Sequence, residues 1–98
     1  MTDAHAPIHP GEILFEDYMK PLGLSQYALA KAIGVSAPRI GNIVHGKRSI
    51  TPSTALRLAR AFGTSPRFWM NLQTRYDLEI ESAAHRAELD DIRPLVGA

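Results

Sequence analysis

The sequence has no cysteine, and it has no apolar run long enough to be a signal peptide or to cross a membrane. The absence of cysteine excludes disulfides, thiolate metal ligands and cysteine nucleophiles, and it is compatible with a reducing compartment. Residues 1–10 are polar and contain proline, unlike a signal peptide. We therefore expect a cytoplasmic protein with no membrane partner. Its 98 residues are enough for one domain and too few for a second.

Acidic residues are missing from the middle of the chain. No aspartate or glutamate lies between Tyr18 and Tyr76, although the net charge is only +1. The same stretch contains the basic residues Lys20, Lys31, Arg39, Lys47, Arg48, Arg57, Arg60, Arg67 and Arg75. A run of one charge is usually a solvated face without a partner. Phosphate binding is the other interpretation, and the local structure must decide between them.

Residues 26–45 predict two short helices joined by a tight turn. Ser25 and Ser36 are suited to cap the two helix starts, and Gly34 is suited to the left-handed position that ends the first helix. Ala30 is small enough for the helices to cross closely. The apolar positions that face inward at helical and cross-turn spacing are Leu29, Ile33, Val35, Ile40 and Ile43. This is a helix-turn-helix pattern, although spacing alone also fits a structural pair of core helices.

The outer face of the second predicted helix favours a DNA groove. It contains no acid and few bulky side chains, its members being Ser36, Ala37, Pro38, Arg39, Gly41, Asn42 and His45. A helix that faces only solvent usually carries mixed acidic and basic pairs, whereas one that lies against a duplex needs small residues and a few hydrogen-bond donors. Together with the acid-free basic centre, this face predicts sequence-specific binding of double-stranded DNA.

Position along the hairpin suggests how it would dock. Gln26 lies at the first turn of its helix, where it can reach a phosphate and also brace the next helix. Residues 36–38 enter the major groove, Arg39 reads guanine or clamps a phosphate, and Asn42 reads adenine or holds a phosphate. Gly41 either permits a close approach or has no role. The predicted DNA-binding residues are Gln26, Ser36, Ala37, Pro38, Arg39, Asn42, His45, Lys47 and Arg48.

Three further helices surround the hairpin. Pro10 fits the first position of a helix that stops at Pro21. Pro52 and Pro66 mark two more helix starts, the second of which continues beyond Ile80 with a break near Ser82. We predict a flexible tail at residues 1–8, a helix-turn-helix domain at residues 9–81, and a C-terminal extension at residues 82–98 for which a helix is one option. The fold class is all-α.

A single recognition helix covers few base pairs, so a two-fold homodimer on a palindromic operator is expected. The apolar stripe of the last predicted helix is the candidate dimer surface, although core packing is expected to take part of it. We assign Phe68 and Leu72 to the core. The predicted interface residues are Trp69, Tyr76, Leu78 and Ile80.

Enzyme and metal functions have little support. The four histidines, His5, His9, His45 and His85, are scattered, and only His5 and His9 have ligand-like spacing. The acids of the first predicted helix, Glu12, Glu16 and Asp17, have no nucleophile or glycine-rich phosphate loop beside them. We therefore predict no catalytic residue, no metal and no cofactor.

Five short helices with a helix-turn-helix as the second and third resemble the lambda-repressor-like domain. Within that class, several short sequence motifs across about residues 8–81 resemble those of the HigA antitoxin family. These motifs are HPGEIL at His9–Leu14, LGLSQ at Leu22–Gln26, GKRSIT at Gly46–Thr51, ALRLARAFGTSP at Ala55–Pro66 and FWMNLQ at Phe68–Gln73. The last seventeen residues resemble the family only through IRPL.

The resemblance implies an antitoxin of a type II toxin-antitoxin pair. Such proteins neutralise a RelE-like mRNA-cleaving toxin and, as homodimers, repress the operon that encodes both. An acidic surface near Glu12, or the stretch from Asp77 to Glu81, would suit a basic toxin. At residues 39–44 this chain reads RIGNIV where relatives often read RINEIV, so the resemblance does not predict the operator. A stand-alone XRE-type transcriptional regulator without a toxin partner is the alternative.

Overall fold

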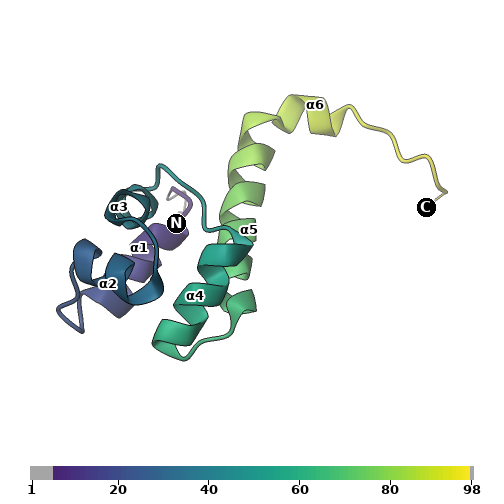
Figure 1. Cartoon of the computed structure of the whole chain (residues 1–98). Helices are drawn as coiled ribbons and strands as arrows, with labels where there is room; N and C mark the ends of the chain where they lie inside the picture. Colours follow the sequence, from purple (N-terminus) through teal and green to yellow (C-terminus); the bar gives the residue numbers. More distant parts are fainter. Residues whose placement is uncertain (1–5, 98) are drawn as a thin grey trace.

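The structure, a computed structural model, describes residues 6–97, and within this range it contains helices and no strand (Figure 1). Its elements are α1 (Pro10–Ile13), the π-helix η1 (Leu14–Met19), α2 (Gln26–Ile33), α3 (Ala37–Val44), α4 (Pro52–Phe62), α5 (Pro66–Ala84) and α6 (Arg86–Asp90). The first half of α5 packs against the body formed by the earlier helices, and its second half leads away to α6. The predicted all-α fold with a helical C-terminal extension is confirmed.

Short polar caps set where the helices begin. The caps of α2, α3, α4 and α5 are Ser25, Ser36, Thr51 and Ser65. Each hydroxyl oxygen accepts a hydrogen bond from the backbone N–H three residues later, at 3.0 to 3.4 Å. α2 and α4 end where Gly34 and Gly63 adopt left-handed φ angles of 74° and 71°. The predicted starts of these helices are therefore confirmed.

The first predicted helix is divided between α1 and η1. It begins at Pro10 as predicted, but from Leu14 to Met19 the backbone takes π-helical geometry. Hydrogen bonding between residues five apart brings Leu14 and Met19 nearly into line, and both side chains are buried. Sequence periodicity did not predict this widening, because the apolar spacing of residues 13–19 also fits an ordinary α-helix.

The core lies between the hairpin, η1, α4 and the start of α5. Its largest buried members are Trp69, Leu14, Met19, Leu29, Ile40, Ile43, Ile50 and Leu58. Leu29 and Ile33 of α2 and Ile40 and Ile43 of α3 face inward as predicted, while Val35 in the turn is only half-buried. The inner surface of the hairpin is thus fixed by apolar packing, which leaves its outer surface for contacts.

The prediction that Trp69 lies at a dimer interface is wrong. Trp69 is fully buried in the core, where its Nε1–H donates to the Thr64 hydroxyl at 2.7 Å. Its ring lies among those of Tyr18 and Phe68, with centroid distances of 5.1 and 5.0 Å. Phe68 and Leu72, predicted as core, are half-buried at its margin. α5 is therefore rotated so that Trp69, rather than Phe68, points inward.

Gln73, one turn after Trp69, is the second buried residue of α5, and sequence analysis gave it no role. Its Oε1 accepts the Ile50 N–H at 2.7 Å, and its Nε2 donates to Asp77 at 3.0 Å. A buried backbone N–H without a hydrogen-bond partner is costly, and Gln73 supplies the acceptor that the Ile50 N–H needs. The lone amide on an otherwise apolar helix face was the available signal.

α1 crosses α3 at Gly11, where the two backbones touch. A Cβ atom built on Gly11 would overlap the Ile43 carbonyl oxygen and lie 2.9 Å from the Val44 Cα. Both obstructing atoms belong to the backbone of a helix, which cannot move aside as a side chain does. Only glycine fits this position.

We expect Gly11→Ala to lower the free energy of unfolding by about 3 kcal/mol, at the upper end of the range for overpacking, because α1 must move off α3. Urea denaturation followed by circular dichroism measures this loss. Gly97→Ala is the matched control, since nothing lies within 4 Å of its added methyl group. Equal midpoints for the two variants would contradict the close crossing.

Candidate nucleic-acid interface

The helix-turn-helix consists of α2 and α3, which pack against each other across the turn at Gly34. The Val35 N–H donates to the Ala30 carbonyl oxygen at 3.0 Å and closes the turn. From α4, the Arg57 guanidinium donates to the Ile33 carbonyl oxygen at 2.7 Å. This contact caps the end of α2 and holds α4 against the hairpin, so Arg57 contributes to positioning rather than to the outer surface.

The predicted contact residues of α3 lie at its start and one turn later. The Ser36 hydroxyl caps the helix by accepting the Arg39 N–H at 3.3 Å. Pro38 and Asn42 are exposed, whereas Ala37 and Arg39 are half-buried. For arginine, partial burial typically covers the aliphatic stem and leaves the guanidinium in water. α3 therefore presents a compact surface with a small set of polar ends.

Gly41 was assigned to the outer face of α3, and that assignment is wrong because Gly41 is buried. A Cβ built on Gly41 would lie 2.8 Å from Gln26 Nε2 and 3.4 Å from Gln26 Cδ. The Gln26 side chain thus lies directly over Gly41. The close approach that this glycine permits is that of a side chain from α2, which agrees with the predicted bracing role of Gln26.

The turn after α3 brings Lys47 and Arg48 beside the end of the helix. Their backbone N–H groups both donate to the Asn42 carbonyl oxygen, at 2.8 and 3.2 Å. His45 closes the helix, with its Nδ1 2.7 Å from the Gly41 carbonyl oxygen. The three side chains are exposed. Backbone hydrogen bonds therefore fix the position from which the two cations extend.

His9 links the start of α1 to this turn and to α5. Its Nδ1 accepts the Gly11 N–H at 2.9 Å, and its ring meets the Tyr76 ring edge to face at a centroid distance of 4.8 Å. The position that a Cβ on Gly46 would take lies 3.7 Å from the same imidazole. Burial lowers the pKa of His9 below its ordinary value of 6.5, and the Asp77 carboxylate partly opposes this. The ring is therefore neutral at pH 7, with its proton on Nε2.

The cations of the hairpin and the following turn form no ion pair with an acid of residues 6–97. Arg39, Lys47 and Arg48 take part in none of the ion pairs of that range. Those pairs join Lys20 to Glu16, Arg75 to Glu79, and His85 to Glu81 and Glu88. Within residues 6–97 no ion pair compensates the charge of this surface, which is available to an anionic partner.

The remaining predicted interface residues lie where α5 leaves the body. Tyr76 is half-buried against His9, whereas the exposed fractions of Leu78 and Ile80 are 63% and 38%. The predicted break comes at His85 rather than near Ser82, with α6 following it. Leu78 and Ile80 are the two predicted interface side chains that remain exposed apolar groups.

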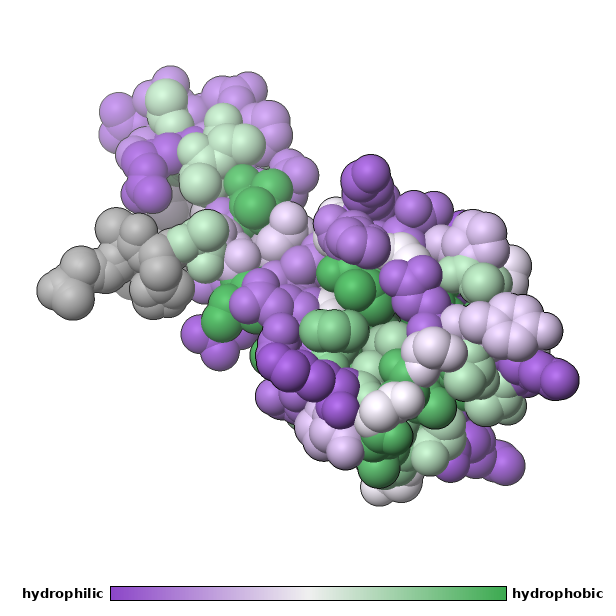
Figure 2. Space-filling model, turned by 90° about the vertical axis from the view of Figure 1, so that its left-hand side faces the viewer, coloured by the Kyte–Doolittle hydropathy of each residue, from purple (hydrophilic) through white to green (hydrophobic). Residues whose placement is uncertain are grey.

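Within the described range, no three histidine, cysteine or acidic side chains come together in a way that could hold a metal ion. His5, the possible companion of His9, lies outside that range. No helix between residues 6 and 97 is long and apolar enough to cross a membrane. Figure 2 shows that hydrophilic and apolar side chains are interspersed over the visible side of the body.

Comparison with known proteins places this geometry in a family. A family model described as helix-turn-helix matches residues 15–69. Virulence-associated protein I of Dichelobacter nodosus is 59% identical over 73 residues, which are 74% of this chain and 68% of that protein. Antitoxin HigA-1 of Vibrio cholerae is 34% identical over 89 residues, which are 91% of this chain and 84% of that protein.

A solved structure agrees with these relatives. The structure of Pseudomonas aeruginosa antitoxin HigA with its higBA promoter is 45% identical and superimposes with a TM-score of 0.88, covering 92% of this chain and 99% of that chain. The chain belongs to the helix-turn-helix family and, within it, to the HigA antitoxins.

The lowered pKa of His9 predicts a pH dependence of stability. Because the folded protein binds this proton more weakly than the unfolded chain, the stability that neutral His9 contributes is present above pH 6.5. It is lost as the pH falls from 6.5 through the lower pKa of the folded state. Denaturant titrations across this range should show the loss in the wild type and a flatter profile in His9→Asn, which keeps a capping acceptor but does not titrate. Parallel profiles for the two proteins would contradict this origin.

Proposed function

We propose that this protein is the antitoxin of a type II toxin-antitoxin pair, which represses its own operon as a DNA-binding homodimer and neutralises a RelE-like mRNA-cleaving toxin. The observation that carries the proposal is the match over nearly the whole length of an antitoxin solved with its promoter. The free cations around α3 support the DNA-binding half, because they lie on the surface that a duplex would meet.

The proposed DNA complex places α3 in the major groove with Pro38, Arg39 and Asn42 toward the bases. Arg39 is the main base reader, since a guanidinium can donate two hydrogen bonds to guanine. Gln26 contacts a phosphate at the start of α2 while resting on Gly41, so its backbone contact and its bracing role act together. Ser36, Ala37 and His45 line the same edge of α3.

Lys47 and Arg48 act as phosphate clamps in this complex. Their attachment to the Asn42 carbonyl oxygen fixes them relative to α3. Contacts with phosphates position a protein on the duplex but carry no direct sequence information.

Arg39→Ala and Lys47→Ala should therefore differ in kind. The Arg39 variant is expected to bind operator DNA about 1 to 3 kcal/mol more weakly and to lose preference at one base pair. The Lys47 variant should bind all DNA sequences more weakly by the same factor, and the slope of its binding constant against salt concentration should fall by about one unit. Titrations on operator and random duplexes at several salt concentrations measure both effects. Arg86→Ala removes the same charge from α6 and serves as the control; equal losses on both duplexes for Arg39→Ala would reject its reading role.

The homodimer follows from the small footprint of one α3 and from the apolar side chains that α5 leaves exposed. Leu78 and Ile80 are its central contacts, with Tyr76 at the edge that faces the body. Two copies related by a two-fold axis would present their α3 helices to the two halves of a palindromic operator.

The toxin half of the proposal is tested by co-expression. A small basic RelE-like protein encoded beside this gene should copurify with the chain. Co-expression of this chain should relieve the growth arrest that the RelE-like protein causes. The acidic groups of η1, which lie outside the proposed dimer surface, are the surface offered to such a partner. If operator binding is retained but no neighbour copurifies and no growth is rescued, the protein is a stand-alone transcriptional regulator instead.

A further inference from the structure

The C-terminal arm, defined as residues 77–97, consists of the end of α5, α6 and a non-helical tail, and none of its residues is buried. Every position of the arm is exposed, and its apolar members are Leu78, Ile80, Leu89, Ile92, Leu95 and Val96. The radius of gyration is 16.5 Å, whereas a compact chain of about 100 residues has about 13 Å. The arm accounts for this elongation, since it leads away from the body (Figure 1). Helices gain most of their stability from packing, so the arm lacks its packing partner.

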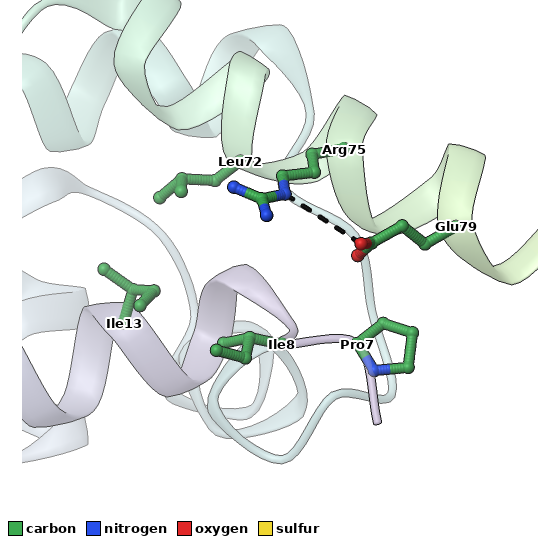
Figure 3. A pocket seen from close by; sticks show the side chains of 6 residues that line it. All are labelled: Pro7, Ile8, Ile13, Leu72, Arg75 and Glu79. Atoms are coloured by element: carbon green, nitrogen blue, oxygen red, sulfur yellow. Dashed lines mark ion pairs between the residues drawn. The ribbon is translucent and has the colours of Figure 1, made fainter. Parts of the chain in front are cut away.

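A hollow of about 220 Å³ lies between α5 and the N-terminal part of the chain, which comprises α1 and the residues just before it. Figure 3 shows Leu72, Arg75 and Glu79 on one side of the hollow and Pro7, Ile8 and Ile13 on the other. Its volume is below the roughly 300 to 1,000 Å³ of small-molecule sites. The hollow therefore suits one or two apolar side chains of a peptide segment better than a small ligand.

We propose that one or two of the apolar side chains of residues 92–96 of one copy occupy this hollow of a second copy, and that the second copy returns the same contact. A copy does not fill its own hollow, because its arm points away from the body. The segment Ile92–Val96 has features that a groove accepts: three apolar side chains, a backbone outside any helix, and Pro94, which has no N–H to leave unpaired. This inference rests on the proposed homodimer and assigns a second contact within it.

The charged residues of the arm and of the hollow support a second copy as the occupant of the hollow. The hollow is bordered by Arg75 and Glu79, which pair with each other at 4.0 Å and remain partly exposed. The arm carries Asp91 just before Ile92 and Arg93 just after it. An acid and a base therefore flank Ile92, as a base and an acid border the apolar hollow.

The hollow is also continuous with the proposed dimer surface. Glu79 at its rim lies between Leu78 and Ile80 in sequence on α5. A partner copy that covers these two side chains would have the hollow at its edge. Reciprocal exchange of identical segments is the arrangement that two-fold symmetry requires of such a contact.

The absence of native cysteine makes the contact testable by disulfide trapping. Chains carrying Ile8→Cys alone and Leu95→Cys alone are purified, mixed, allowed to exchange subunits, and oxidised. We expect a disulfide-linked species of twice the chain mass that contains one chain of each kind, identified by mass spectrometry of the linked peptide. Leu22→Cys, at a somewhat more exposed site on the loop before α2, replaces Ile8→Cys in the control mixture and should give at least tenfold less of the linked species.

Two outcomes would overturn the exchange. The first is a mixture in which Ile8→Cys links no better than the Leu22→Cys control. The second is the double variant Ile8→Cys/Leu95→Cys closing within a single chain. A wild type that is monomeric by sedimentation would instead reject the dimer itself, so the two failures are distinguishable.

A second measurement does not depend on cysteine chemistry. The variant Ile92→Asp/Leu95→Asp should raise the dimer dissociation constant at least tenfold in sedimentation equilibrium, while Leu22→Asp leaves it unchanged. Because all three side chains are exposed in one copy, neither variant disturbs the core. An unchanged dissociation constant for the arm variant would show that the arm takes no part in the dimer.

Discussion

The crossing of α1 over α3 at Gly11 is the contact on which the proposed DNA surface depends. α3 has only eight residues and is too short to be stable alone, so its orientation comes from what holds it from behind. Apolar packing supplies cohesion through Ile40 and Ile43, but apolar contacts are not directional. The touching backbones at Gly11 and Ile43 fix the separation of the two helices, because neither can yield.

α5 connects this crossing to the proposed dimer. Through Gln73 it holds the Ile50 N–H at the end of the turn that carries Lys47, and through Tyr76 it packs against His9. The same helix then presents Leu78 and Ile80 to solvent. In a two-fold dimer one rigid helix would thus set both the position of the basic turn and the distance between the two α3 helices. Half-site spacing would follow from α5 rather than from any flexible linker.

Local signals in the sequence predicted the helix starts and the hairpin well. Ser36, Thr51 and Gly34 act within one turn of their own position, so their effect can be read without knowing the rest of the fold. The buried face of α5 could not be predicted from such local signals. The regular apolar spacing from Phe68 suggested one face, whereas the buried face runs through Trp69 and the polar Gln73.

The candidate site shows the same division. The hairpin and its free cations were predictable, but the burial of Gly41 was not, because it results from Gln26 reaching across from a preceding helix. His9 was considered as a metal ligand and is instead the cap of α1; its Nδ1 accepts the Gly11 N–H, and its ring meets the Tyr76 ring edge to face. Contacts between elements decided both cases, and a single sequence carries no direct record of them.

The arm and the hollow together bear on how the fold is stabilised. The first half of α5 belongs to the core of its own chain, so its order does not depend on concentration. Residues 77–97 are all exposed within one copy, and the conformational entropy lost in ordering each of them must be offset by contacts from outside. If those contacts come from a second copy, the arm folds only as the dimer forms, and its stability rises with protein concentration. The body would then be a stable unit at any concentration, and the dimer, rather than the domain, would be the unit in which the whole chain is folded.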